Sequence, residues 1–353
     1  MRVSQVLKAG AALTGVVGVA GMAAYALSRR PYLREVAPGL RSPVLYLPMH
    51  LLADATFART SRFFASIDFS RPMRHAVDVT EFSASFDGHA FSARVLTPRG
   101  ATAGAAASGP RPVVVWTHGG GHLIGGPAMY DPQNARMAAE LGAIVVAPRY
   151  HKSTQEPFPA DHDECYAALR WVQEHGDKLG GDTSRIAVAG DSAGGGLAAG
   201  LVQRAFDEGH PVRALGLVYP MLDHRTTDKS GAVGQFIWTA GPNRGAWSMY
   251  LGDDHLDVDL PPYASPATRS DLSGLPPTWI GVGGIDLFCD ESVAFAQALD
   301  AAGVDTTLDV WAGAYHGFDQ IKPTAPQSRE LIDALIDHLR RHLESHVLRE
   351  VKR

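Results

Sequence analysis

The stretch Gly190-Asp191-Ser192-Ala193-Gly194-Gly195-Gly196 decides the fold. It lies between an apolar run that ends at Ala189 and a helical pattern that begins at Leu197. In this strand-turn-helix context a serine sits on a sharp, strained turn with its hydroxyl exposed. The start of the following helix offers free N–H groups and a dipole that favour negative charge on a nearby oxygen. The motif therefore predicts an α/β fold in which Ser192 is a nucleophile.

A second glycine-rich motif, His118-Gly119-Gly120-Gly121, directly follows the apolar run 113–117. Successive glycines let backbone N–H groups face a substrate oxygen without obstruction by side chains. The carboxyl ends of strands are also where α/β sheets gather their sites. We expect His118 to position this loop by hydrogen bonding. The expected oxyanion hole has three backbone donors: Gly120, Gly121 and Ala193.

The rest of the chain alternates short apolar runs with helical patterns. The runs lie at 113–117, 143–148, 185–190, 214–219, 278–282 and 307–311. The helical patterns lie at 132–142, 160–175, 194–208, 291–303 and 328–346. Continuously apolar strands separated by helices are typical of a parallel sheet that is covered on both faces. We therefore predict an α/β fold with a mostly parallel central sheet flanked by helices.

Three segments stand outside this alternation. Residues 75–98 alternate in polarity around Asp87-Gly88, which predicts an antiparallel hairpin. Residues 31–75 mix apolar clusters with arginines, and residues 223–262 form an aromatic insertion between two strands. We expect the last two segments to form a helical cap over the site. The predicted organisation is a terminal segment 1–30, a cap portion 31–75, and a catalytic domain 76–353 that carries the cap insertion 223–262.

Near the N-terminus, Ala9 to Leu27 is a run of 19 residues without a charge. A helix of that length can span a bilayer. The favoured interpretation is an uncleaved anchor that holds the protein at a membrane through residues 9–27. The alternative is a signal peptide cut near Ala24-Tyr25-Ala26, which would leave an exported enzyme. The flanking arginines and lysine leave the side of the membrane open.

Composition and motifs exclude several classes of protein. The chain has 353 residues and a net charge of −5, without the basic stripe that nucleic-acid binding requires. Two cysteines supply neither a disulfide framework nor a multi-cysteine zinc site. His338, His342 and His346 share one helical face, but a solvated helix flank explains them better than a metal site. We expect no metal and no cofactor, since no dinucleotide-binding motif opens a helix.

The general base and its carboxylate follow from chain order. In this kind of fold the order is serine, acid, histidine, each at the end of a successive strand. Asp286 follows the run 278–282, and His316 follows the run 307–311 between two glycines. Asp290 is the rival acid, but it falls at the start of a helix, where a capping or dipole role explains it. We predict a triad of Ser192, Asp286 and His316.

At these residues the chain resembles the hormone-sensitive-lipase-like family of α/β-hydrolase esterases. The resemblance covers about residues 111–342 and includes both glycine motifs, the acid string Asp286 to Glu291 and the string His316-Gly317-Phe318. Two positions depart from the family pattern. His122 stands where an aromatic residue is usual, and Tyr150-His151-Lys152-Ser153-Thr154-Gln155 replaces Tyr-Arg-Leu-Ala-Pro. We expect the first to change one wall of the site, and the second to alter a loop and leave the chemistry unchanged.

The resemblance implies a carboxylic ester hydrolase. Together with the aromatic residues of the cap segments, it favours small apolar esters with short to medium acyl chains. An amidase or deacetylase with the same triad remains the alternative, because acyl transfer to either substrate uses the same groups. A non-catalytic binding protein on this fold is disfavoured, because neither the serine nor the histidine has been lost.

Overall fold

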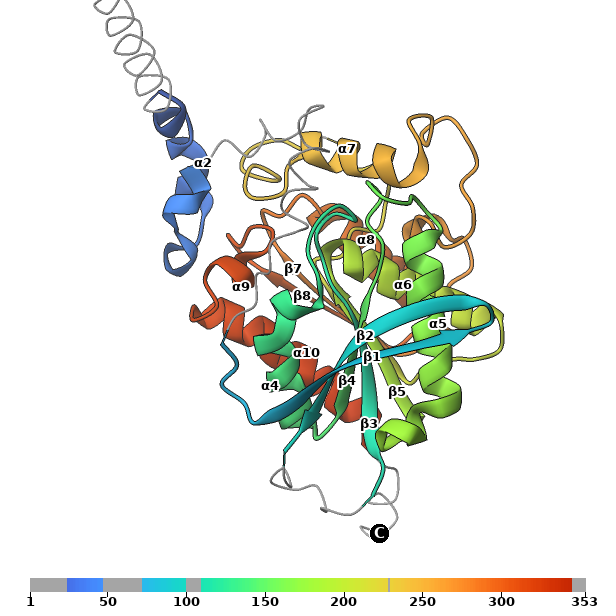
Figure 1. The fold of residues 1–353 in the computed structure, drawn as a ribbon. Coiled ribbons are helices and arrows are strands. Elements are labelled where there is room, and N and C mark those ends of the chain that lie inside the picture. The colour runs from blue at the N-terminus through green and yellow to red at the C-terminus, as the bar shows by residue number, and fades with distance from the viewer. Residues whose placement is uncertain (1–23, 47–71, 100–108, 228, 345–353) are drawn as a thin grey trace, which may run out of the picture.

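A computed structural model of the chain describes residues 24–46, 72–99, 109–227 and 229–344. One sheet of eight strands forms its centre, in the order β1-β2-β4-β3-β5-β6-β7-β8 (Figure 1). Strands β1 and β2 form an antiparallel hairpin at one edge, and all pairs from β4 to β8 are parallel. The strands are β1 (Val77–Phe86), β2 (His89–Pro98), β3 (Arg111–Thr117), β4 (Ile144–Arg149), β5 (Gly181–Asp191), β6 (Ala214–Val218), β7 (Thr278–Gly283) and β8 (Thr306–Trp311).

Helices cover both faces of the sheet (Figure 1). Helices α4 (Asp131–Leu141) and α10 (Pro326–Leu343) pack on one face. Helices α5 (Ala160–His175), α6 (Ser192–Asp207) and α8 (Cys289–Ala301) pack on the other. The predicted fold class is therefore confirmed, with the expected strands and helices in the expected order.

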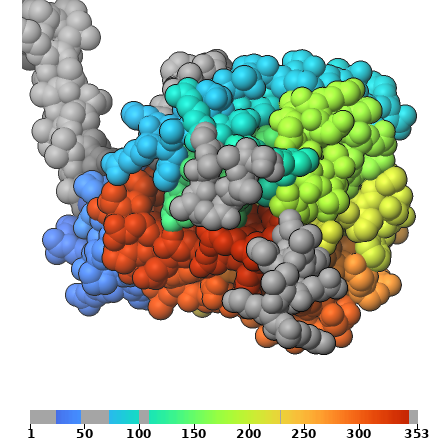
Figure 2. All heavy atoms as spheres, turned by 90° about the horizontal axis from the view of Figure 1, so that it is seen from below, coloured from blue at the N-terminus to red at the C-terminus, as the bar shows by residue number. Residues whose placement is uncertain are grey.

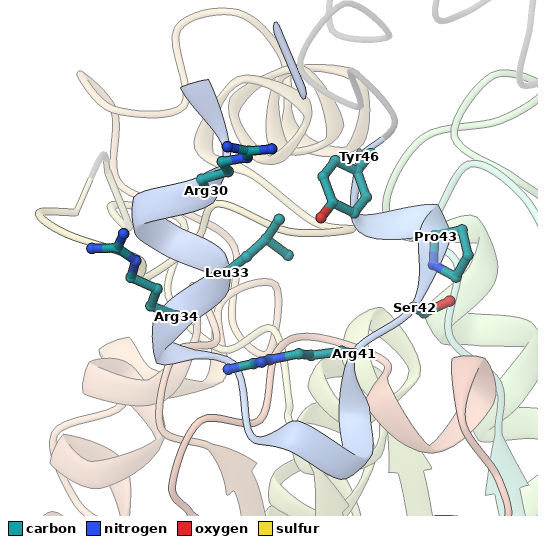
Figure 3. Close-up of a pocket in the computed structure, with 7 residues that line it drawn as sticks. All are labelled: Arg30, Leu33, Arg34, Arg41, Ser42, Pro43 and Tyr46. Carbon is teal, nitrogen blue, oxygen red and sulfur yellow. The ribbon is translucent and has the colours of Figure 1, made fainter. Parts of the chain in front are cut away.

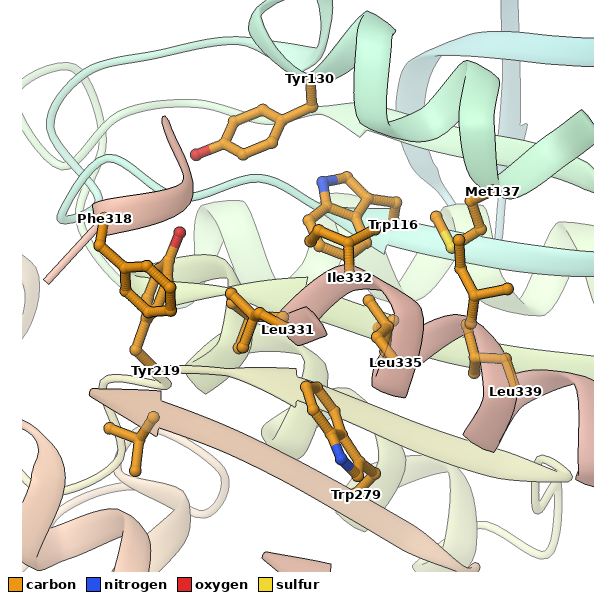
Figure 4. Packing of buried hydrophobic residues seen from close by; sticks show 14 of the residues in the cluster. Trp116, Tyr130, Met137, Tyr219, Trp279, Phe318, Leu331, Ile332, Leu335 and Leu339 are labelled. Carbon is orange, nitrogen blue, oxygen red and sulfur yellow. The ribbon is translucent and has the colours of Figure 1, made fainter. Parts of the chain in front are cut away.

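Strand β3 shows why the central runs are continuously apolar. Successive side chains of a strand point to opposite faces of the sheet. Val114 and Trp116 accordingly join the core under α4 and α10, whereas Val113 and Val115 join the core under α5 and α6. In Figure 4, Trp116 lies close to the side chains of α10. A strand buried on both faces has no position for a polar residue, so its sequence does not alternate.

Helix α7 (Ala240–Leu251) belongs to the aromatic insertion and lies beyond the end of the sheet where the parallel strands finish (Figure 1). Its Trp247 and Tyr250 are buried in a third apolar cluster with Ala193 and Phe288. The insertion thus covers the start of α6. Its assignment to a cap together with residues 31–75 stays a prediction, and residues 47–71 lie outside the described residues.

The N-terminal segment carries helix α2 (Arg30–Glu35) and the short helices η1 (Pro38–Leu40) and η2 (Pro43–Tyr46). It packs beside the C-terminal part of the chain (Figure 2). There the Ala37 N–H donates to the Gly313 carbonyl, and the Tyr315 hydroxyl donates to the Leu40 carbonyl. The segment curves around a hollow of about 480 Å³ whose lining includes Arg30, Arg34, Arg41 and Tyr46 (Figure 3).

Two predictions about the chain ends have different outcomes. Within the described residues no helix is long and apolar enough to cross a membrane, and most of the run 9–27 lies outside them.

The solvated flank predicted for the α10 histidines is wrong for His338, whose side chain is only 2% exposed. Because α10 packs along the sheet, its buried stripe is wide enough to include His338. Burial lowers the pKa of His338 to about 3. His346 lies outside the described residues.

Candidate active site

The nucleophile motif forms a sharp turn between β5, which ends at Asp191, and α6, which begins at Ser192. The backbone of Ser192 has φ +53°, a left-handed conformation that a non-glycine residue rarely adopts. Gly194 lies so close to the neighbouring loop that a Cβ there would be 2.2 Å from the Thr117 carbonyl oxygen. Close packing thus holds the strained turn and leaves room only for glycine at position 194.

The structure brings Ser192, His316 and Asp286 together. The Ser192 Oγ lies 2.9 Å from His316 Nε2, and His316 Nδ1 lies 2.9 Å from Asp286 Oδ2. Asp286 is 0% exposed, and its other oxygen accepts a hydrogen bond from the Phe288 N–H. A carboxylate at Nδ1 keeps the ring proton on that nitrogen, so Nε2 is free to accept the serine proton.

Asp290, the rival carboxylate, lies elsewhere. It occupies the first turn of α8, its side chain is 69% exposed, and it forms an ion pair with Lys229 at 2.9 Å. An acidic residue in the first turn also stabilises a helix through its dipole. The structure therefore gives Asp290 a surface role and puts Asp286 beside the histidine.

Aromatic rings surround His316 from three elements. Tyr219, which follows β6, and Phe288, which precedes α8, meet its ring edge-on with centroids 4.8 and 5.2 Å away. Trp238 of the insertion lies 6.3 Å away. These rings leave His316 only 6% exposed and present an apolar surface to anything bound beside it.

The glycine loop after β3 is tied to the nucleophile turn by Asp191. One oxygen of this buried carboxylate accepts the Gly119 N–H and the other accepts the Tyr130 hydroxyl, each at 2.7 Å. Burial raises the pKa of Asp191 to about 7, and the two hydrogen bonds act in the opposite direction. Asp191 thus fixes the loop at a set distance from Ser192. The motif showed an aspartate here, but nothing in its spacing indicated these partners.

The three expected oxyanion donors lie on the two motifs that Asp191 joins. Gly120 and Gly121 have positive φ values of +127° and +60°, and their N–H groups donate to no acceptor in the parts of the chain that the structure describes. Ala193 is the second residue of α6, where a backbone N–H has no partner within the helix. Backbone N–H groups of this kind are suited to bind a developing oxyanion, and the assignment of these three donors stays a prediction.

Trp238 is a site residue that the sequence analysis did not single out. A Cβ built on Gly121 would lie 2.3 Å from its ring, so the indole covers the glycine loop as well as His316. Its Nε1 donates to Asn243 of α7 at 3.1 Å. The preceding Ile237 has φ +62°, a strained conformation for a β-branched residue. The aromatic insertion was the only signal that could have found Trp238.

No group of three or more potential metal ligands gathers anywhere in the described ranges. His122 is 2% exposed and pairs with Asp161 at 2.7 Å, and the expectation that it changes a wall of the site stays a prediction. Its ring stacks on Tyr250 of α7, with centroids 3.8 Å apart. His122 thus joins the glycine loop to α5 and to the insertion.

Comparison with known families identifies this architecture. A family model described as alpha/beta hydrolase fold matches residues 114–320, which include both glycine motifs and the histidine turn. The chain belongs to the α/β-hydrolase family. Its resemblance to the hormone-sensitive-lipase-like esterases within that family is confirmed.

The relatives that the chain matches include two bacterial ester hydrolases. The carboxylesterase NlhH of Mycobacterium tuberculosis is 37% identical over 242 residues, which cover 66% of this chain and 75% of the relative. The ethyl acetate hydrolase of Pseudomonas putida is 30% identical over 323 residues, which cover 88% of this chain and 97% of the relative.

A solved structure gives the same result. A bacterial heroin esterase matches with a TM-score of 0.74 and 33% identity, covering 88% of this chain and 99% of its own. The prediction that the hydrolase is an enzyme of the serine esterase class is confirmed by these matches.

Proposed function

We propose that this hydrolase cleaves carboxylic esters with Ser192 as nucleophile, His316 as general base and Asp286 as the carboxylate that orients the base. One observation carries the proposal. The hydroxyl of a serine held on a strained turn lies 2.9 Å from a histidine nitrogen whose partner nitrogen is bound to a buried carboxylate. That arrangement activates an otherwise weak nucleophile.

Each residue has one task in the proposed reaction. His316 takes the Ser192 proton as the oxygen attacks the ester carbonyl, and Asp286 stabilises the resulting imidazolium. The oxyanion is bound by the N–H groups of Gly120, Gly121 and Ala193. His316 then gives the proton to the departing alcohol, which leaves an acyl group on Ser192. A water molecule, deprotonated by His316, releases the acid.

The proposed substrates are apolar esters with short to medium acyl chains. Support comes from the rings of Trp238, Phe288 and Tyr219 around His316, which form an apolar and confined surrounding. The name of the Pseudomonas relative, an ethyl acetate hydrolase, agrees with a small substrate.

A stopped-flow experiment with a series of p-nitrophenyl esters tests the proposal. An acyl-enzyme mechanism predicts a burst of nitrophenol followed by slower turnover, with the acyl group found on the peptide that contains Ser192. The rate should fall as the acyl chain lengthens beyond the medium range. A matched pair of an ester and an amide separates the esterase from an amidase or deacetylase. Label on another residue, or faster cleavage of the amide, would contradict the proposal.

We further propose that residues 9–27 attach the enzyme to a membrane, or export it if they are cleaved. The apolar run supports this proposal, as do Arg30, Arg34 and Arg41 just beyond it, because basic side chains favour an anionic membrane surface. Removal of residues 2–23 should move the protein from the membrane pellet to the supernatant, with unchanged activity on a soluble ester. A full-length protein found in the supernatant with its own N-terminus intact would exclude both forms of the proposal.

A further inference from the structure

The segment after β4, where the chain departs from the family pattern, contains a buried lysine. Lys152 stands at the position of the usual leucine and is only 5% exposed. Its Nζ lies 3.0 Å from His118 Nε2 and 3.6 Å from the centre of the Tyr150 ring. Burying an amine is costly unless it is hydrogen-bonded, so the hydrogen bond to His118 and the Tyr150 ring together hold this side chain.

The hydrogen bonds of His118 define which of its nitrogens carries the proton. The His118 ring is 0% exposed. Its burial is the main cause that lowers the pKa of His118 well below the usual value, and the charge of the nearby Lys152 adds to the effect. The ring is therefore neutral and has a single N–H. Nδ1 lies 2.7 Å from the Gly119 carbonyl oxygen, which can only accept, so the proton is on Nδ1. Nε2 then accepts from Lys152, which favours this tautomer over the other.

The Gly119 carbonyl belongs to the same planar peptide as the Gly120 N–H. In a trans peptide these two groups point in opposite directions. A hydrogen bond that holds the carbonyl toward His118 therefore turns the Gly120 N–H to the other side of the loop. The Gly119 N–H is bound by Asp191, so the loop is held on both sides of this residue.

We propose that Lys152 is a positioning residue: it keeps His118 in the tautomer that binds the Gly119 carbonyl and so aims the Gly120 N–H at the oxyanion. The proposal rests on the proposed function, in which Gly120 is an oxyanion donor. It changes the expectation that this segment alters a loop and leaves the chemistry alone.

Charge makes the contact dependent on pH. Burial lowers the pKa of Lys152 to about 7, and Asp161 acts in the opposite direction. The amine is therefore charged below about pH 7, where its bond to Nε2 is strongest, and becomes a weaker donor as the pH rises. The charged and titratable groups that face it are His118 of the glycine loop, Arg149 at the end of β4, Tyr150 just after β4, and Asp161, Glu164 and Cys165 of α5.

The test compares Lys152→Met, which keeps the apolar stem and loses the amine, with Lys178→Met at an exposed position as the control. Misplacing one oxyanion donor should lower kcat by about tenfold or more and leave KM within about twofold. Nitrogen-15 NMR of histidine-labelled protein should show His118 with its proton on Nδ1 in the wild type and a mixture of tautomers in Lys152→Met. The control should match the wild type in both measurements.

The NMR arm does not depend on catalysis. If the wild type lacks esterase activity, the proposed function fails while the tautomer still reports on the contact between Lys152 and His118. If Lys152→Met does not fold, the wild-type spectrum decides, because the proposal requires the proton on Nδ1 and a His118 signal that changes as Lys152 titrates. A proton on Nε2, or a folded Lys152→Met variant with kcat within about twofold of the wild type, would overturn the proposal.

Discussion

The nucleophile turn and the glycine loop face each other across the site but are held in different ways. The turn is fixed by close backbone packing, since a Cβ at Gly194 would meet the backbone of Thr117 and His118, and Ser192 is strained in place between β5 and α6. The glycine loop is held by side chains from other elements, among them Asp191 and Tyr130. A region fixed by close backbone packing requires glycines, and glycines at fixed positions can be recognised as a motif. A region held by distant polar groups can be recognised only in part.

The largest expected effect is at the turn itself. Ser192→Ala removes the nucleophile and keeps the backbone, because alanine is smaller than serine at the same position. We expect kcat for ester hydrolysis to fall by about 10⁶-fold, as for removal of a triad serine elsewhere. Circular dichroism and thermal melting should match the wild type. A folded variant that retains more than about a tenth of the activity would show that Ser192 is not the nucleophile.

The next effect concerns the carboxylate behind the base. Asp286→Asn keeps the shape but removes the charge that fixes the His316 tautomer, and should lower kcat by about 10⁴-fold. Asp290→Asn is the matched control, since its side chain is exposed and pairs with Lys229 on the surface. It should change kcat by less than about twofold. If folded Asp290→Asn loses more activity than Asp286→Asn, the two roles are reversed.

On the glycine loop, Tyr130→Phe removes one of the two hydrogen bonds to Asp191. We expect a loss of about tenfold in kcat, because the loop is less well positioned, and about 1–3 kcal/mol of stability, because a buried acceptor loses its donor.

The stability loss in Tyr130→Phe should depend on pH. The pKa of Asp191 is raised to about 7 from an ordinary 3.8, so ionising this carboxyl in the folded state costs stability as the pH rises. The Tyr130 hydroxyl lowers that pKa, and without it the pKa of Asp191 rises further. The difference in unfolding free energy between wild type and variant should therefore be larger above pH 7 than below it. Denaturant titrations over that range measure it, and an equal difference at all pH values would exclude the mechanism.

The smallest effect is expected where a side chain supports the nucleophile turn. The Thr117 hydroxyl donates to the Gly194 carbonyl at 2.6 Å. Thr117→Val should cost about 1 kcal/mol of stability and leave kcat within about twofold, because packing still holds the turn. Chemical denaturation and steady-state kinetics give both numbers. A larger loss of activity in Thr117→Val than in Tyr130→Phe would remove the distinction between the two regions.

The alternation of apolar runs and helices was enough to predict the sheet and its flanking helices. Burial on both faces makes each central strand continuously apolar, and that signal is local in the chain. The hairpin 75–98 was equally clear, because Asp87 and Gly88 lie at its turn. The helix that contains His338 was predicted, but its buried stripe was not, because the width of that stripe depends on how α10 lies against the sheet.

By itself the sequence determined the family, the order of the strands along the chain, and the candidate residues Ser192, Asp286 and His316. These features depend on short motifs and on periodicity, which are properties of neighbouring residues. Only the tertiary structure showed that Trp238 covers the glycine loop and that Lys152 contacts His118. The reason is physical: a hydrogen bond or a packing contact between residues far apart in the chain depends on distance and direction in space, and a linear pattern contains neither.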